Sequence, residues 1–355
     1  MMCEFFLLQS ELRTDMKSTK FHTIMIVLHD FAGVSHNISA LKTNPLWPER
    51  AQGIGRFYLQ GRFMKLRKVL AVILLSLVVF AFPSCDFLSG MFENNSGPSV
   101  EGDDSNALFG YPSAVSSRNT QLIEREAYTL LYSYDDLIPL WVSWHIDSGD
   151  LGEGRKDAFD KDPLVPDEYA VDENDYKNSG FNRGHMCPNA DRSVTVALAD
   201  QTFYMSNMVP QNPNNNKGNW GNFEEYLRDL VKDGHDEVYI IAGPAGTGGY
   251  NEDDKFFNAI EADVGGETKE IRVPEYVWKV ALVIDEGNND LQRIEEGIPD
   301  AIAVIMPNKN LSGTSWENYI CTVDDVESLT GYDFFSELSD STEKLVESQK
   351  YQNFH

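Results

Sequence analysis

Apolar runs bounded by turn residues recur through the second half of the chain and predict a β-sheet. They are rich in β-branched and aromatic residues, a composition typical of strands. We expect strands at 127–134, 140–146, 238–242, 277–284 and 301–306. No regular helical crossover separates these runs, so we expect an α+β fold with a mixed, largely antiparallel sheet and helices packed on it.

A different spacing follows the asparagine-rich segment at 209–219. Apolar residues there recur at the interval of one helical face and predict an amphipathic helix: Trp220, Phe223, Leu227, Leu230 and Val231. Glu224 and Arg228 are four residues apart and share another face of this helix. Such a pair is usually a weak surface salt bridge. A second, shorter helix is expected within 321–329, and residues 201–208 are expected to form a short element before a loop.

The strongest apolar run lies upstream of this pattern. A basic run at 65–68 precedes an apolar core at 69–82 and Cys85, the order of a bacterial lipoprotein signal. We therefore interpret 64–85 as a signal peptide, with a lipid anchor on Cys85 and export to the cell envelope (as an outer membrane lipoprotein) or secretion. Cleavage without lipidation and an uncleaved anchor are the alternatives. The apolar core is shorter than the roughly 20 residues of a membrane-spanning helix.

The predicted signal peptide separates an upstream segment from the part of the chain that follows it. We interpret 1–63 as an upstream extension typical of translated non-coding sequence, the alternative being a short segment ahead of a membrane helix. Residues 86–115 are polar and predict a flexible linker. The globular domain is expected at 116–340, and 341–355 is interpreted as a C-terminal tail.

Net charge and cysteine content argue against two classes of protein. The net charge of −27 argues against a protein that coats nucleic acid with a basic face. A polyanionic substrate therefore needs a few local cations or a metal ion. The four cysteines form no CxxC pair, which argues against a structural zinc site. Cys187 and Cys321 are candidates for a disulfide in an oxidising compartment.

Candidate chemistry is concentrated at 182–192, in a stretch that begins Asn182-Arg183-Gly184-His185. Histidine exchanges protons near neutral pH, and arginine matches the geometry of phosphate oxygens. The long polar loop before it, 147–181, carries Arg155. The asparagines of 209–219 form either a solvated turn or a set of amide oxygens for a cation. His145 follows a tryptophan on a predicted strand, and we interpret it as structural.

Several motifs, taken in order, resemble the DNA/RNA non-specific endonucleases, the sugar-non-specific nucleases with a ββα-metal (His-Me finger) core. The resemblance covers roughly 120–338 and is carried by four islands: Asn182 to Met186, Ser206 to Gln211, Asn216 to Trp220, and Glu224 with Arg228. Further similar segments are Tyr239 to Pro244, Val273 to Val280, and Thr322 to Gly331. Ordered islands with matching spacing are more specific than one motif.

The resemblance implies an Mg²⁺-dependent hydrolase of DNA and RNA, with Mn²⁺ as a substitute. It assigns His185 as general base, Asn216 as the protein ligand of the metal, and Glu224 as the residue that holds the hydrated ion. It implies phosphate contacts for Arg228 and Arg155, and it implies that Arg183 either braces the loop or contacts a backbone phosphate. It gives Asn207 a part in orienting the loop.

This sequence departs from the family at Asn182, where the family has aspartate. The amide keeps an oxygen but loses a charge that supports the metal or the basicity of His185. A catalytically weak nuclease-like protein that binds nucleic acid, or a surface lipoprotein, is therefore the alternative function. A phosphodiesterase for smaller substrates is the alternative within the hydrolases.

Overall fold

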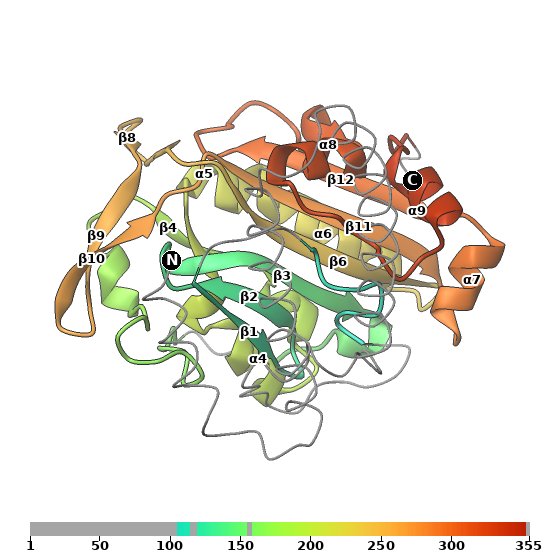
Figure 1. Ribbon diagram of the computed structural model, residues 1–355, viewed down its shortest axis with the longest axis horizontal. Coiled ribbons are helices and arrows are strands. Elements are labelled where there is room, and N and C mark those ends of the chain that lie inside the picture. Colours follow the sequence, from blue (N-terminus) through green and yellow to red (C-terminus); the bar gives the residue numbers. More distant parts are fainter. Residues whose placement is uncertain (1–104, 114–118, 155–157, 353–355) are drawn as a thin grey trace, which may run out of the picture. The chain divides into compact units, whose positions relative to one another are not determined.

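The computed structural model describes residues 105–113, 119–154 and 158–352. At its centre is a seven-stranded sheet in the order β1-β2-β3-β6-β11-β12-β13, in which every neighbouring pair is antiparallel (Figure 1). The strands are β1 (Thr120–Glu124), β2 (Thr129–Ser133), β3 (Ile138–Ile146), β6 (Asp236–Ala245), β11 (Tyr276–Asp285), β12 (Asp300–Pro307) and β13 (Ile320–Cys321). The predicted α+β class with a largely antiparallel sheet is confirmed.

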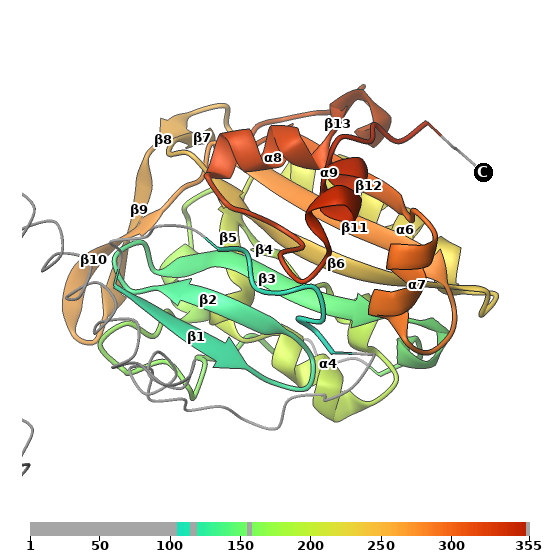
Figure 2. The same ribbon diagram turned by 45° about the vertical axis from the view of Figure 1, so that its right-hand side comes forward.

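Successive side chains of the central strands point to opposite faces of the sheet. Each face is covered by its own hydrophobic cluster. On β6, Ile240 belongs to one hydrophobic cluster and Ile241 to the other. The first cluster includes residues of α6 (Gly221–Val231), and the second includes residues of α8 (Val323–Thr330) and α9 (Asp340–Glu347). Figure 2 shows α8, α9 and α7 (Asp290–Glu296) together on one face of the sheet.

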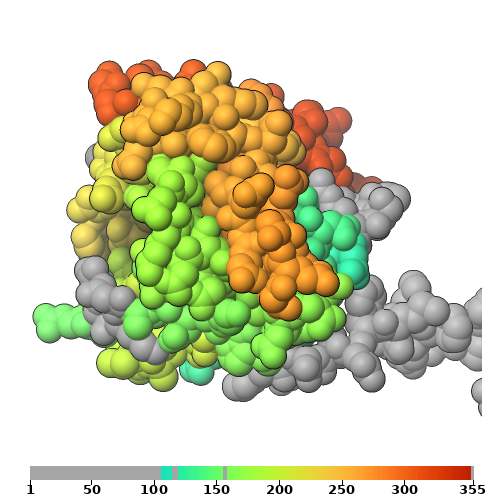
Figure 3. All heavy atoms as spheres, turned by 90° about the vertical axis from the view of Figure 1, so that its left-hand side faces the viewer, coloured from blue at the N-terminus to red at the C-terminus, as the bar shows by residue number. Residues whose placement is uncertain are grey.

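Smaller elements extend from this framework. Helix α4 (Val196–Thr202) and the single turn α5 (Pro213–Asn215) precede α6 in the chain. Three two-stranded ribbons complete the fold: β4 (Asn182–His185) with β5 (Met208–Gln211), β7 (Gly249–Tyr250) with β8 (Phe256–Phe257), and β9 (Ala259–Val264) with β10 (Glu267–Arg272). Figure 3 shows the β9–β10 ribbon, in orange, beside the green residues of the long loop. That loop contacts the ribbon through Asp175, which accepts a hydrogen bond from the backbone of Asp263 at 3.2 Å.

The folded domain is longer than the sequence predicts at both ends. Phe109, within the predicted linker, is 3% exposed and packs edge-on against Tyr239 with ring centroids 4.7 Å apart. Val346, within the predicted tail, is fully buried on α9. Both segments are largely polar, and each contributes only a few apolar side chains to the core. Their sequence pattern therefore did not predict that they belong to the folded domain.

The predicted signal peptide, Cys85 and the extension at 1–63 lie outside the described residues and stay predictions. Among the described residues, no helix combines the length and apolar character needed to cross a membrane.

Helix α9 carries a carboxyl group whose protonation is expected to make stability depend on pH. Burial, followed by the charge of Glu327, raises the pKa of Glu347 from 4.5 to about 8. Between these values the folded protein holds a proton that the unfolded chain has lost, so stability falls as pH rises from about 4.5 to about 8. We expect a lower melting temperature at pH 8.5 than at pH 5, and a smaller difference in Glu347→Gln.

The matched control for this prediction is Glu296→Gln, which changes an exposed carboxylate on α7. This control is expected to keep the pH dependence of the wild type. An equal pH dependence in Glu347→Gln and the wild type would contradict the assignment.

Candidate functional site

The site is organised around the β4–β5 ribbon, in which Asn182 pairs with Gln211 and His185 with Met208. After β5 the chain passes through α5 and a π-turn at Asn216–Trp220 into α6. Two antiparallel strands followed by a helix form the ββα unit that the sequence predicts. The Nε1 atom of Trp220 donates to the backbone oxygen of His185 at 3.2 Å, which ties the start of the helix to the end of β4.

Gly184 is required by the close approach of the two strands. A Cβ atom at this position would lie 2.2 Å from Gln211 Oε1 and 2.7 Å from Gln211 Cβ, well inside contact distance. We expect Gly184→Ala to destabilise the protein by about 1–3 kcal/mol, the usual cost of overpacking a closely packed site. Thermal unfolding measures this loss, and any activity that depends on His185 should fall with it, because His185 is the next residue.

The control is Gly297→Ala. Its backbone is extended (φ −144°, ψ 135°), and an added Cβ would meet nothing nearer than 3.7 Å. If Gly184→Ala is as stable as this control, the ribbon is looser than the structure indicates.

His185 lies in an apolar setting with an unpaired ring nitrogen. The rings of Phe159 and Phe203 lie 5.5 and 5.1 Å from its ring, centroid to centroid. Its Nε2 atom is buried and has no hydrogen-bond partner among the described residues. Burial, followed by the charge of Arg183, lowers the pKa of His185 from 6.5 to about 4. The imidazole is therefore neutral at pH 7 and able to accept a proton.

Asn207 holds the backbone directly after His185. Its side chain accepts a hydrogen bond from the Cys187 amide at 3.0 Å and donates to the oxygens of Cys187 (2.8 Å) and Thr202 (2.9 Å). Its own backbone oxygen accepts from Met186 at 3.0 Å. Asn207 is fully buried, so these bonds compete with no solvent. They fix the path of the chain as it leaves β4.

The disulfide suggested for Cys187 and Cys321 is wrong, because both cysteines are free thiols. Cys187 is buried beside the Asn207 hydrogen bonds, and burial raises the pKa of its thiol. A protonated, buried thiol is a poor nucleophile, so Cys187 acts as a packing residue.

A cavity of about 520 Å³ opens beside β4 and brings together four of the eight residues singled out from the sequence. They are Asn182, Arg183, His185 and Asn216, and Lys217 also lines the cavity. Arg183 pairs with Glu173 at 3.0 Å and lies over the Phe159 ring at 4.0 Å. Its side chain is 32% exposed, so the guanidinium is within reach of a ligand in the cavity.

The five asparagines of 209–219 differ in burial, which neither sequence interpretation anticipated. Three are buried and anchor the segment to the rest of the domain. Asn212 donates to the backbone oxygens of Tyr250 and Asn251, Asn215 to the backbone oxygen of Pro307, and Asn219 to the hydroxyl group of Thr314. Asn216 is partly exposed and faces the cavity. The buried amides therefore hold the turn that presents Asn216.

Glu224 and Arg228 do not line this cavity; each is paired with a buried residue from another element. Glu224 Oε1 lies 3.3 Å from Lys279 Nζ, and Arg228 lies 2.8 Å from Asp191. Burial raises the pKa of Glu224, while the charges of Lys279 and Arg228 oppose that rise. The pair predicted to share a helix face is therefore part of a wider network, with Lys279 and Asp191 as members that sequence spacing did not reveal.

Arg155 lies outside the described residues, so its phosphate role stays a prediction. His145 is 2% exposed and its Nε2 lies 3.1 Å from Glu237, which agrees with a structural role. Its ligand atom lies within 4.8 Å of carboxylate oxygens of Asp147 and Asp150, a second arrangement that could hold a metal. These carboxylates are already engaged: Asp150 pairs with Arg192 at 2.9 Å and Asp147 caps the turn that follows it.

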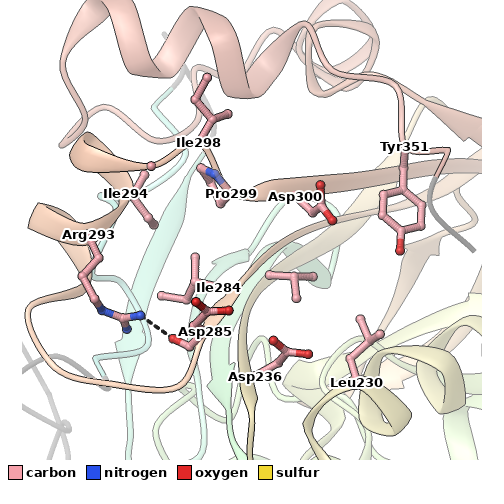
Figure 4. A pocket seen from close by; sticks show the side chains of 12 residues that line it. Leu230, Asp236, Ile284, Asp285, Arg293, Ile294, Ile298, Pro299, Asp300 and Tyr351 are labelled. Atoms are coloured by element: carbon pink, nitrogen blue, oxygen red, sulfur yellow. Dashed lines mark hydrogen bonds between the residues drawn. The ribbon is translucent and has the colours of Figure 1, made fainter. Parts of the chain in front are cut away.

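A separate cavity of about 420 Å³ lies between the ends of β6, β11 and β12 and helix α7 (Figure 4). Asp236, Asp285 and Asp300 lie around it, with Tyr351 at one side and Arg293 at the other. It contains no residue with a predicted catalytic role. We therefore assign the candidate active site to the cavity beside β4, because of the residues that line it and not because of its volume.

Comparison with known proteins identifies related chains. The family model described as DNA/RNA non-specific endonuclease matches residues 105–341. A nuclease from Nostoc sp. is 35% identical over 249 residues, which span 68% of this chain and 84% of the relative. Nuclease C1 from Cunninghamella echinulata is 34% identical over 62% of this chain and 84% of its own length.

The mitochondrial nuclease EXOG of Xenopus laevis is 33% identical over 59% of this chain and 57% of its own length. Among solved structures, EndoG from the EndoG/EndoGI complex has a TM-score of 0.54 at 23% identity. The match covers 67% of this chain and 92% of that one, and it shows a shared fold.

Proposed function

Because the chain belongs to the DNA/RNA non-specific endonuclease family, we propose that the cavity beside β4 is where it hydrolyses internal phosphodiester bonds of DNA and RNA. One observation carries this proposal. The cavity joins a histidine that is neutral at pH 7, an arginine within reach of an anion, and an amide held in place by buried neighbours.

In this proposal His185 is the general base. An unprotonated ring nitrogen takes a proton from the attacking water, and the low pKa of His185 ensures that the nitrogen is free near neutral pH. The phenylalanine rings of Phe159 and Phe203 restrict the orientation of the imidazole. Asn207 keeps the following backbone fixed, so the base stays in position.

The donor set of the cavity fits a hard divalent cation. Asn216 and Asn182 both line it and offer amide oxygens, which are ligands that Mg²⁺ accepts alongside water. We propose Asn216 as the protein ligand, with Mn²⁺ able to replace Mg²⁺. When bound, the ion supplies positive charge next to the scissile phosphate and its leaving oxygen.

The remaining charged residues are assigned to orientation and phosphate contact. Arg183 exchanges its exposed pair with Glu173 for a substrate phosphate, since guanidinium groups bind phosphate oxygens at two points. Arg228 and Arg155 are the other phosphate contacts in this proposal, and Glu224 on α6 would hold the hydrated ion through its water molecules. A few cations then hold a polyanion although the chain carries a net charge of −27.

Covalently closed substrates test this proposal. We expect purified protein with Mg²⁺ or Mn²⁺ to nick and then linearise circular plasmid DNA, and to degrade a long single-stranded RNA. Products should span a range of lengths, because no end is needed to start cleavage. If both polymers stay intact while short phosphodiesters are hydrolysed, the alternative of a small-substrate phosphodiesterase is correct.

The replacement of the family's aspartate by Asn182 supports a second candidate, a nuclease-like protein that binds nucleic acid without turnover. Asn182 lines the cavity and supplies no charge. Binding and cleavage measured on one labelled DNA separate the two functions. Retained binding with no cleavage at any metal concentration would favour the binding protein.

A further inference from the structure

A lysine is buried beneath the candidate active site. Lys279 lies on β11, two residues from Val277 and from Ala281, and these neighbours pack in the same core cluster as α6. Since alternate strand residues share a face, the Lys279 side chain points to the α6 side of the sheet. Its side chain is 1% exposed. A buried ammonium is costly unless its charge is compensated.

Three groups surround that ammonium. Glu224 Oε1 accepts a hydrogen bond from Lys279 Nζ at 3.3 Å. The ring centroids of Trp220 and Trp144 lie 4.4 and 5.2 Å from Nζ. Indole faces attract cations, so the two tryptophans compensate part of the charge without taking a proton. Within the part of the chain that the structure describes, the ionic partner of Lys279 is the carboxylate of Glu224, a residue of the proposed site.

Trp220 links the same lysine to the proposed base. Trp220, whose ring faces Lys279, donates its Nε1 hydrogen to the backbone oxygen of His185. Trp144, the second indole near Lys279, donates to Asp191 at 2.9 Å, and Asp191 pairs with Arg228. Glu224 and Arg228 of α6 are thus each anchored to a group that contacts Trp144.

We propose that Lys279 is a positioning residue, which holds the Glu224 carboxylate in place for the reaction and supports Trp220 beneath His185. The inference rests on the proposed function, because it concerns the role of Glu224 in that site. A methionine would fill nearly the same volume without the desolvation of an ammonium. The charge is therefore the property of Lys279 that serves the site, since packing alone does not require it.

A double-mutant cycle tests the proposal with Lys279→Met, Glu224→Gln and the variant that carries both. The first measurement is the melting temperature of metal-free protein. Lys279→Met leaves an unpaired buried carboxylate and is expected to lower it by about 5–10 °C. The double variant removes both charges and is expected to recover part of this loss. Lys232→Met is the matched control, because that lysine is 57% exposed on its side chain and pairs with Asp229 at the surface.

The second measurement is steady-state cleavage of plasmid DNA at saturating Mg²⁺. Lys279→Met is expected to lower kcat by about 10- to 100-fold, the usual effect of losing a group that orients an active-site residue. KM for DNA should change less than about threefold, because Lys279 does not contact the substrate. Once Glu224 is glutamine, removal of Lys279 should cost almost nothing more.

Two results would overturn the proposal. Additive effects in both measurements mean that Lys279 does not act through Glu224. Coupled melting temperatures with an unchanged kcat mean that the pair is structural only. If Lys279→Met alone does not fold, the comparison of the double variant with Glu224→Gln decides: equal kcat supports the proposal, and a much lower kcat in the double variant contradicts it.

Failure of the proposed function is distinguishable from failure of this inference. A wild-type protein that cleaves neither DNA nor RNA refutes the function, whereas the metal-free melting temperatures still report whether Lys279 and Glu224 are coupled.

Discussion

Replacing His185 by alanine is expected to lower kcat for plasmid cleavage by about 100- to 10,000-fold, the range that general-base catalysis usually contributes. The structure gives the physical reason. The imidazole is neutral at pH 7, it lines the cavity, and a buried ring nitrogen has no partner among the described residues. Binding of DNA should be retained, because Arg183 and the neighbouring cations are unchanged. Single-turnover cleavage and fluorescence anisotropy measure the two effects separately.

The fold of His185→Ala should survive, since the side chain makes no hydrogen bond that holds other elements together. His235→Ala is the matched control, because His235 is exposed in the turn after α6. A His185→Ala protein that cleaves within about twofold of this control would remove His185 from the mechanism.

The second large effect is expected at Asn216. Asn216→Ala should raise the Mg²⁺ concentration needed for half-maximal rate by about 100-fold or more, since an amide oxygen that binds the ion directly contributes at least as much as a supporting contact. Asn216→Asp keeps an oxygen at the same place and should retain much more activity than the alanine variant. Rates measured over a wide range of Mg²⁺ concentrations show the shift.

The control for Asn216 lies in the same segment. Asn214 is exposed, and its backbone nitrogen is capped by Asn212. Asn214→Ala is expected to leave the metal dependence unchanged. An unchanged metal requirement in Asn216→Ala would place the metal elsewhere.

Strands β1 and β13 of the central sheet were missed, because β1 is mostly only partly buried and β13 has two residues. The other five strands could be predicted from sequence, most clearly where a strand is long and buried on both faces. Residues 238–242 and 277–284 lie within β6 and β11, whose side chains are almost all buried. The ribbons give weaker local signals: β4–β5 was expected only through the ββα core that the family resemblance implies, and β7–β8 and β9–β10 were not predicted. Strand β4 has only four residues, three of them polar and partly exposed, and β10 is largely charged. Strand β4 also pairs with β5, a strand distant in the chain, and local pattern does not reveal that pairing.

The candidate site divides in the same way. His185 and Asn216 were predicted from residue type, motif order and resemblance, and the fold brings them to one cavity. The counter-ions Lys279 and Asp191 were missed as members of the network. Lys279 occupies a strand position where an apolar residue is expected, and Asp191 follows a proline-bearing loop. Only the tertiary contacts show that each is paired with a residue of α6.

Asn216 also shows why a motif needs its surroundings. The sequence offered a choice between a solvated turn and a cation site for the asparagine-rich segment. In the structure the buried Asn212, Asn215 and Asn219 anchor the segment, so that Asn216 alone of these four lines the cavity. The sequence motifs indicated that this segment belongs to the site. The burial of each asparagine then shows which ones anchor the segment and which one lines the cavity.

Anomalous diffraction from crystals soaked in Mn²⁺ tests the central claim most directly, because it locates the metal relative to the cavity beside β4. The proposed mechanism predicts a peak within about 2.3 Å of the Asn216 side-chain oxygen, and no such peak in Asn216→Ala. A peak only at His145, Asp147 and Asp150, in protein that cleaves DNA with Mn²⁺, would contradict it.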